Sequence, residues 1–495
     1  MPPRASDPQK EQPIHSEMQT EYPELNLLIG GEWRSGDNRR HEDVLNPANE
    51  NTLARLPHAT VQDLDEALAV AEKGFALWRA VPAQDRGRIL KKAADLMRER
   101  GEELARIATL ESGKPLAETR IEAAMSADII EWYAEEGRRA YGRMLMTRAP
   151  GTRMTVRKEP VGPVAALAPW NFPLGNPARK LGGALAAGCS CILKPAEETP
   201  ASGLGVARAL VDAGLPKGVL SVVFGIPGEV STHLLASPVI RKVSFTGSTV
   251  VGKQLMKLAA DGMKRTTMEL GGHAPVLVFD DVDVDKVLNE AVAAKFRNAG
   301  QVCVSPTRFY VHEKIHERFV AGFAERARNL AVGDGMIATN KMGPLIHSRR
   351  RESVDALIRD AETHGAEIRA GGRRFGERGY FYQPTVLANV PNSARIMNEE
   401  PFGPVAIVNS FSDTDAAIRE ANRLPYGLAA FAFTQNLNIA NRLGDALEAG
   451  MVGVNTFRIS VPDSPFGGVK ESGHGSEEGI EGLEACLVTK FVSEA

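Results

Sequence analysis

Apolar residues recur at three- and four-residue intervals between positions 61 and 141, as in VQDLDEALAVAEKGFALWRA. This spacing places apolar side chains on one face of a helix, so the region is predicted to be helical. From position 160 short apolar runs alternate with helical stretches, and the runs GPVAALAPW, CSCILKP, LSVVFG and KVSFTG are typical of buried strands. The patterning predicts helices first and an α/β arrangement after them.

The stretch between the first two apolar runs, LGNPARKLGGALAAG, has the apolar stripe of a helix: Leu174, Ala178, Leu181 and Leu185, with Gly188 at its C-terminal end. A strand, a helix and a strand at this spacing predict a right-handed parallel unit. A second alternation follows, with strands APVLVFDD, TRFYVHE, PVAIVNS, AAFAFTQ and GMVGVNT and helices near 284–297 and 313–330. We therefore expect two α/β domains that meet near residue 271.

Charge and composition exclude several classes of protein. The 59 basic and 62 acidic residues give a net charge of −3, which argues against binding to nucleic acid or to an anionic membrane. The most apolar run, 181–193, is shorter than the roughly 18 residues that span a bilayer, and four cysteines are too few for a disulfide scaffold. Residues 1–22 lack the apolar core of a secretory signal and are expected to form a disordered lead. These features predict a soluble cytoplasmic protein.

Polar residues follow several predicted strands, at the edge where ligands bind in open α/β sheets. In FTGSTVVGK, Gly247 permits a tight turn and Ser248 can cap a helix, whose amides either meet a phosphate or only close the turn. In APWNFPL, Asn171 either donates to an oxyanion or stabilises a turn. In LKPAEETP, Lys194 and Glu197 either hold ribose hydroxyls or face water.

Two residues are candidates for acid–base and covalent chemistry. Glu269 in MELGGHAP lies in an apolar, glycine-rich setting, where desolvation raises the pKa of a carboxyl group and favours a general base. The alternative is a buried glutamate that backbone amides satisfy. Cys303 in FRNAGQVCVSPTR follows a small, flexible Asn-Ala-Gly-Gln segment, and it is either a nucleophile or one more inert thiol of the core.

Seven segments together resemble the aldehyde dehydrogenase superfamily in order and spacing: GPVAALAPWNFPL, LKPAEETP, FTGSTVVG, MELGGHAP, FRNAGQVC, EEPFGPV and SPFGGVKESG. The resemblance extends from about Leu27 to the C-terminus. It implies a Rossmann-like NAD-binding domain from 23–141 and 161–270, an α/β catalytic domain from 271–479, and a small β oligomerisation flap from 142–160 and 480–495. It also implies a homodimer or homotetramer.

The resemblance implies a mechanism as well. Cys303 stands at the nucleophile position and would form a thiohemiacetal whose oxyanion meets the Asn171 side chain, and Glu269 would activate the water that hydrolyses the following thioester. The residues implied to bind NAD are Trp170, Lys194, Glu197, Gly247, Ser248, Leu270, Glu400 and Phe402, and no metal is expected. NADP is left open, although the Glu197 carboxylate would repel its 2′-phosphate.

Arg179, Arg297 and Ser460 resemble the residues with which the succinate-semialdehyde dehydrogenase branch grips the distal carboxylate of its substrate. A guanidinium suits a carboxylate because it donates two parallel hydrogen bonds, but either arginine alone is equally consistent with a solvated surface residue. The expected activity is NAD-dependent oxidation of succinate semialdehyde, with 2-oxoglutarate and glutarate semialdehydes as alternatives. A non-catalytic relative of the same fold is a remote alternative, against which the intact catalytic residues argue.

Overall fold

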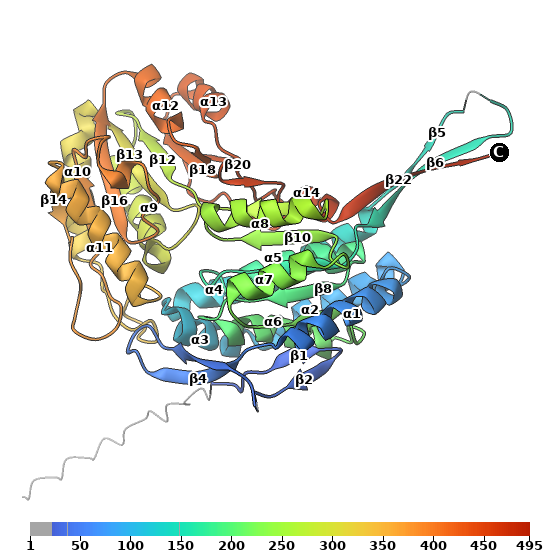
Figure 1. The fold of residues 1–495 in the computed structure, drawn as a ribbon. Coiled ribbons are helices and arrows are strands. Elements are labelled where there is room, and N and C mark those ends of the chain that lie inside the picture. The colour runs from blue at the N-terminus through green and yellow to red at the C-terminus, as the bar shows by residue number, and fades with distance from the viewer. Residues whose placement is uncertain (1–21, 37, 148) are drawn as a thin grey trace, which may run out of the picture.

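Two large sheets organise the protein in the computed structural model, which describes residues 22–36, 38–147 and 149–495 (Figure 1). The first sheet has the strand order β2(Glu32–Arg34), β1(Leu27–Ile29), β9(Leu220–Val222), β8(Cys191–Lys194), β7(Val164–Leu167), β10(Lys242–Thr246), β11(Arg265–Glu269), β21(Gly473–His474). The second has the order β14(Glu367–Ala370), β15(Thr385–Ala388), β16(Val405–Phe411), β13(Pro306–His312), β12(Ala274–Val278), β18(Ala429–Phe433), β19(Met451–Val454). The predicted α/β class is confirmed. The predicted N-terminal lead, apart from Tyr22, lies outside the described residues.

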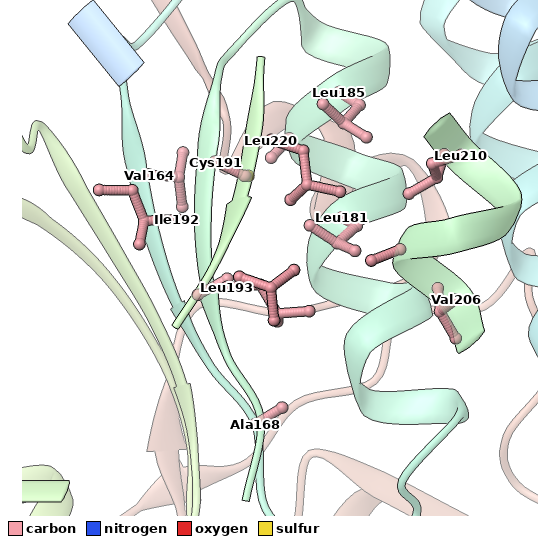
Figure 2. Packing of buried hydrophobic residues seen from close by; sticks show 14 of the residues in the cluster. Val164, Ala168, Leu181, Leu185, Cys191, Ile192, Leu193, Val206, Leu210 and Leu220 are labelled. Atoms are coloured by element: carbon pink, nitrogen blue, oxygen red, sulfur yellow. The ribbon is translucent and has the colours of Figure 1, made fainter. Parts of the chain in front are cut away.

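The parallel centre of the first sheet contains the strand–helix–strand unit that the sequence predicts. β7 leads into α5(Gly175–Ala187), which ends at Gly188 with a left-handed φ of 98°, and the chain continues into β8 beside β7. The next helix, α6(Pro200–Asp212), packs on the same face as α5 (Figure 2). After β9 the strand order reverses, because the next strands, β10 and β11, lie on the other side of β7. Since crossovers are right-handed, the helices of these connections cover the opposite face of the sheet. They are α7(Pro227–Ala236) and α8(Thr249–Asp261).

Apolar side chains fasten α5 and α6 to this sheet (Figure 2). Leu181 and Leu185 on α5 have no exposed surface, and the same is true of Leu193 on β8, which points toward α5. Leu174 and Ala178, which complete the predicted stripe, are also fully buried. Burial of each large apolar side chain contributes about 1.5–3 kcal/mol, which fixes the position of α5 against the strands.

The N-terminal region is helical as predicted, and so are the two segments predicted near 284–297 and 313–330. The N-terminal region forms α1(Val61–Trp78), α2(Ala83–Glu99), α3(Gly101–Ser112) and α4(Leu116–Glu136). The second sheet is accompanied by α9(Val284–Phe296), α10(Glu313–Arg328), α11(Ser348–Thr363), α12(Thr414–Asn422) and α13(Leu437–Ala446). Smaller elements are β3(His41–Leu45), β4(Thr52–Pro57), β17(Tyr426–Gly427), β20(Val469–Lys470) and α14(Gly479–Glu484). None of the helices in the described ranges has both the length and the apolarity needed to cross a bilayer.

A three-stranded sheet projects from the body as an arm (Figure 1). It consists of β5(Arg143–Leu145), β6(Arg153–Pro160) and β22(Leu487–Glu494), and β22 pairs antiparallel with β6 along its whole length. The arm therefore combines the two segments expected to form the oligomerisation flap. Its part in assembly stays a prediction.

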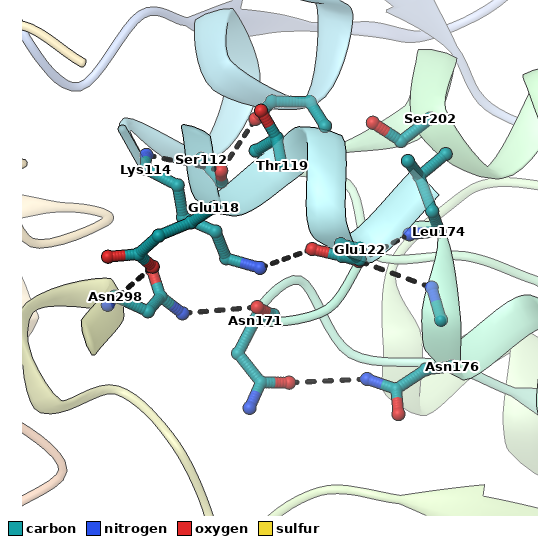
Figure 3. Close-up of polar contacts among 12 residues, drawn as sticks. Ser112, Lys114, Glu118, Thr119, Glu122, Asn171, Leu174, Asn176, Ser202 and Asn298 are labelled. Carbon is teal, nitrogen blue, oxygen red and sulfur yellow. Dashed lines mark hydrogen bonds and ion pairs between the residues drawn. The ribbon is translucent and has the colours of Figure 1, made fainter. Parts of the chain in front are cut away.

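Glu122 on α4 is a buried carboxylate that fixes the start of α5 (Figure 3). It accepts hydrogen bonds from the amides of Leu174 at 2.9 Å and Gly175 at 3.2 Å, and it forms an ion pair with Lys114. The side chains of Lys114 and Glu122 are 1% and 4% exposed. A carboxylate at this position satisfies amides that have no partner within the helix, so α4 determines where the loop after β7 enters α5.

Glu122→Ala is expected to lower the free energy of unfolding by roughly 3–5 kcal/mol, because it removes the carboxylate that is hydrogen-bonded to the buried Lys114 ammonium. Glu135→Ala on the same helix is the matched control: Glu135 pairs with Lys91 where both side chains are about half exposed, and such a pair contributes about 0–1 kcal/mol. Urea unfolding followed by circular dichroism measures both. Equal losses in the two variants would show that Glu122 is not an anchor.

Candidate active site

The carboxyl edge of the first sheet brings together residues predicted to bind the cofactor. Trp170 follows β7, Lys194 ends β8, Gly247 follows β10 and Leu270 follows β11. These four strands are adjacent and parallel, so segments far apart in the sequence end side by side. Ligands of open α/β sheets bind at this edge, next to the point where the strand order reverses.

Lys194 and Glu197 form an ion pair at this edge instead of facing water separately, and their side chains are 7% and 14% exposed. Lys194 Nζ also donates to the Pro195 carbonyl at 3.2 Å. Ser248 caps α8 as predicted, because its Oγ accepts a hydrogen bond from the Val251 amide at 3.4 Å. A fixed carboxylate and a capped helix N-terminus have the chemistry to hold ribose hydroxyls and a pyrophosphate.

The loop before β16 reaches the same edge from the second sheet. Phe402 lies edge-on to Trp170, with ring centres 5.6 Å apart and planes at 80°. Glu400 accepts a hydrogen bond from the Gly272 amide at 3.2 Å, and burial raises the pKa of its carboxyl group to about 7. The predicted cofactor residues of the two sheets thus meet across the boundary between them.

Residues 297–303, here called the cysteine loop, connect α9 to β13. Asn298, Ala299 and Gly300 have left-handed φ values of 48°, 51° and 71°, and all three are buried. The Asn298 amide donates to Glu118 Oε2 at 2.9 Å, which helps to offset the cost of left-handed backbone at two residues other than glycine. The expected flexible segment is therefore a strained and hydrogen-bonded turn.

Asn171 lies against the cysteine loop (Figure 3). Its Nδ2 donates to the Gln301 carbonyl at 3.2 Å, and its Oδ1 accepts a hydrogen bond from Asn176 at 3.3 Å. Asn298 in return donates to the Asn171 carbonyl at 3.1 Å. Because an amide nitrogen carries two hydrogens, the Asn171 side chain has a second N–H, which has no acceptor among the described residues. The first N–H binds the carbonyl of Gln301, which lies two residues before Cys303.

Glu269, the last residue of β11, is 2% exposed, and neither of its carboxyl oxygens has a hydrogen-bond partner among the described residues. Burial raises the pKa of Glu269 well above its ordinary value; the Glu477 carboxylate adds to this effect, while Lys180 and Arg179 oppose it. Within the described residues no backbone amide satisfies this glutamate, and its catalytic role stays a prediction. A buried carboxyl group without partners beside a thiol is typical of a functional site.

The Cys303 thiol lies within electrostatic range of several charged groups. Burial raises its pKa to about 12, the Arg179 guanidinium lowers it, and the carboxyl groups of Glu400 and Glu269 raise it further. At neutral pH the sulfur is therefore a protonated thiol, and its proton must be removed before it can act as a nucleophile.

Arg179 and Ser460, which the sequence places in separate segments, are in contact. Arg179 Nη2 donates to Ser460 Oγ at 3.1 Å, and the guanidinium lies 4.2 Å from the ring centre of Phe466. Arg179 Nε donates to Glu478 Oε1 at 2.7 Å, and the arginine side chain is 12% exposed. Arg179 is thus an ion-paired, mostly buried residue and not a solvated one.

Arg297 has a different environment. It is exposed, and its guanidinium carbon lies 5.6 Å from the ring centre of Phe172. Burial raises the pKa of Glu118 to about 7, and the charges of Lys114 and Arg297 oppose this rise. The structure therefore joins two of the three predicted substrate residues and places the third against Phe172.

Sequence reasoning missed a second ion pair beside Arg179. The fully buried Lys180 Nζ donates to Glu477 Oε1 at 2.6 Å, to Thr246 Oγ1 at 2.7 Å and to Ser244 Oγ at 3.3 Å. The available signal was the pair of adjacent basic residues in an otherwise apolar helix, because buried cations require counter-charges. Nothing local to that helix identifies Glu477 as the partner.

Alkylation of Cys303 by iodoacetamide is expected to accelerate about tenfold per pH unit from pH 7 to pH 10, because a thiol whose pKa is raised stays largely protonated over this range. A cysteine in an unstructured peptide, with a thiol pKa of about 8.5, is the control, and its alkylation rate levels off above about pH 9. Loss of label in Cys303→Ala assigns the signal, and a plateau below about pH 9 in the protein would contradict the raised pKa.

Comparison with known proteins gives a consistent result. The sequence model of the Aldehyde dehydrogenase family matches residues 33–492. The 4-(hydroxymethyl)benzenesulfonate dehydrogenase TsaD1 of Comamonas testosteroni is 50% identical over 94% of this chain and 97% of its own length. The NADP(+) succinate-semialdehyde dehydrogenase GabD of Escherichia coli (strain K12) is 43% identical over 94% of this chain and 96% of its own length. A crystal structure of succinate-semialdehyde dehydrogenase from Burkholderia pseudomallei has a TM-score of 0.94 and 41% identity, covering 98% of this chain and 100% of that chain. The chain therefore belongs to the aldehyde dehydrogenase family and is an enzyme that acts on aldehydes.

Proposed function

We propose that the enzyme oxidises a short aldehyde with an anionic group at its far end, and that succinate semialdehyde is its substrate. The observation that carries this proposal is the contact between Arg179 and Ser460, with Arg179 close enough to lower the pKa of the Cys303 thiol. A guanidinium and a hydroxyl at this place can donate to a distal carboxylate while the aldehyde carbon meets the sulfur. The E. coli and C. testosteroni relatives are named for compounds that carry a carboxylate and a sulfonate.

In the proposed mechanism Cys303 gives its proton to solvent water, and the thiolate attacks the aldehyde carbon. The free N–H of the Asn171 side chain and the Cys303 amide donate to the oxyanion that forms, and they need no reorganisation because the cysteine loop is fixed by hydrogen bonds. Loss of hydride from the former aldehyde carbon converts this adduct into a thioester, and Glu269 takes a proton from the water that hydrolyses the thioester. Its raised pKa makes the ionised carboxylate a stronger base than an exposed glutamate.

The edge of the first sheet fits a nicotinamide dinucleotide, and we infer that NAD is preferred over NADP. When bound, the cofactor supplies the acceptor for the substrate's hydride. Glu197, which Lys194 holds in place, would accept hydrogen bonds from ribose hydroxyls of a bound cofactor and would repel a 2′-phosphate of about −2 charge. The inferred preference for NAD rests on Glu197 alone. The E. coli relative, by contrast, is named for NADP(+).

A second candidate substrate is an aromatic aldehyde that carries a sulfonate. The 50% identical C. testosteroni relative, named for a benzenesulfonate, favours it. A sulfonate presents three acceptor oxygens to the donors that would bind a carboxylate. Glutarate and 2-oxoglutarate semialdehydes remain closer variants of the first proposal, because one methylene contributes only about 1–3 kcal/mol to discrimination.

Steady-state kcat/KM for succinate semialdehyde, glutarate semialdehyde, 4-formylbenzenesulfonate, butanal and benzaldehyde tests the proposal. Arg179→Met removes the charge and keeps an apolar stem, so it is expected to lower kcat/KM for the anionic aldehydes by roughly ten- to a hundredfold. Butanal oxidation is also expected to fall, because Arg179 lowers the pKa of the Cys303 thiol, but by a smaller factor, since butanal has no distal anion to lose. Arg458→Met, at an exposed arginine two residues before Ser460, is the control. Butanal turnover as efficient as that of the acids in the wild type would refute the proposal.

The cofactor inference has its own test. Wild type is expected to show a higher kcat/KM with NAD than with NADP, and Glu197→Gln is expected to narrow that ratio by roughly tenfold or more, because it removes the charge facing the 2′-phosphate. Asp43→Asn, at an exposed carboxylate that lines the same cleft as Glu197, is the matched control. Equal or better use of NADP by the wild type would show the inference wrong.

A further inference from the structure

Glu478 lies in a backbone conformation that residues with side chains rarely adopt. Its φ of 58° and ψ of 178° fall in a region essentially restricted to glycine. Two hydrogen bonds hold this backbone: the Glu478 amide donates to the Tyr133 hydroxyl at 2.7 Å, and the Glu478 carbonyl accepts from the Gly482 amide at 2.8 Å. Conformations of this kind cluster at functional sites, which directs attention to what the Glu478 side chain does.

The Glu478 carboxylate contacts two of the residues assigned to the substrate. Oε1 accepts a hydrogen bond from Arg179 Nε at 2.7 Å, and Oε2 accepts one from Ser460 Oγ at 3.4 Å. The Ser460 hydroxyl also accepts from Arg179 Nη2 at 3.1 Å. The Glu478 side chain has no exposed surface. Glu478, Arg179 and Ser460 therefore form a closed cluster, called here the Arg179 cluster.

The Arg179 cluster is balanced in charge before any substrate arrives. Glu478 neutralises Arg179, as Glu477 neutralises the neighbouring Lys180. Within the described part of the chain Arg179 Nη1 makes no hydrogen bond, so this nitrogen can still donate to a ligand. A substrate anion that binds there meets a carboxylate already attached to the same guanidinium.

We propose that Glu478 is a specificity-determining residue: it is an internal counter-anion that shares Arg179 with the substrate and limits how tightly anionic aldehydes bind. The inference rests on the proposed function, in which Arg179 receives the distal anion. Two anions on one guanidinium repel each other, and the repulsion is stronger in a site shielded from water than in bulk solvent. The acid product carries the same distal anion, so the same repulsion favours its release.

Glu478→Gln tests the charge separately from the hydrogen bond, because glutamine keeps an oxygen that can accept from Arg179. The variant is expected to lower KM for succinate semialdehyde roughly tenfold or more, and to strengthen inhibition by succinate of butanal oxidation by a similar factor. The KM for butanal is expected to change far less than the KM for succinate semialdehyde, because butanal has no distal anion, whereas a merely structural role would move both alike. Glu481→Gln, at an exposed carboxylate three residues later, is the matched control and is expected to change none of these.

An unchanged or higher KM for succinate semialdehyde in Glu478→Gln, with a wild type that prefers this substrate to butanal, overturns the inference and leaves the proposed function in place. A wild type without that preference refutes the proposed function, and the inference fails with it. If Glu478→Gln does not fold, Glu478→Gly replaces it, because glycine adopts this backbone conformation without strain and also removes the charge. The same fall in KM is expected, and its absence overturns the inference.

Discussion

Two buried cations on one helix constrain the layout of the whole site. Arg179 and Lys180 belong to α5, which apolar packing fixes against the first sheet, and a buried charge without a partner costs several kcal/mol. The turn that carries Glu477 and Glu478 must therefore lie beside α5. That turn follows β21, which joins the first sheet although it comes after the second sheet in the sequence. Ion pairing thus joins the end of the chain to the substrate side of the site.

Burial shifts the pKa of both reactive groups in the same direction. It raises the pKa of the Glu269 carboxyl group and of the Cys303 thiol, and the Glu269 carboxyl group adds to the rise at Cys303. Arg179 opposes both effects, so its charge bears on the reacting atoms as well as on the distal end of the proposed substrate. A single residue therefore links substrate binding to the electrostatics of the thiol.

Local patterns in the sequence predicted the features that depend on local periodicity. The apolar stripe of α5, its end at Gly188 and the cap at Ser248 all follow from short-range spacing, and each is present. β14 and α11 were not predicted because charged residues interrupt their apolar positions, and β15 was not predicted because its apolar run, TVLA, is short. The left-handed residues 298–300 were mistaken for a flexible segment, since tertiary hydrogen bonds and not local propensity hold them.

The sequence indicated which residues belong to the candidate site but not which of them form pairs. Asn171 was expected near Cys303 and lies against its loop, and Arg179 meets Ser460. The partners of the buried cations could not be found in the sequence, because α5 and the 477–478 turn are separated by almost three hundred residues and meet only through the register of the sheet. The separate position of Arg297 over Phe172 depends likewise on the path of the cysteine loop.

The position of α14 between the 477–478 turn and β22 has a practical consequence for shortening the protein. Only α14 and a few connecting residues separate the counter-charges of α5 from the strand that completes the arm. A deletion that begins within β22 removes arm contacts and leaves both ion pairs intact. A deletion that begins a dozen residues earlier leaves two cations in a dry interior with no carboxylate. C-terminal truncations of this enzyme should therefore fall into two classes, and only the longer products are suitable for separating assembly from chemistry.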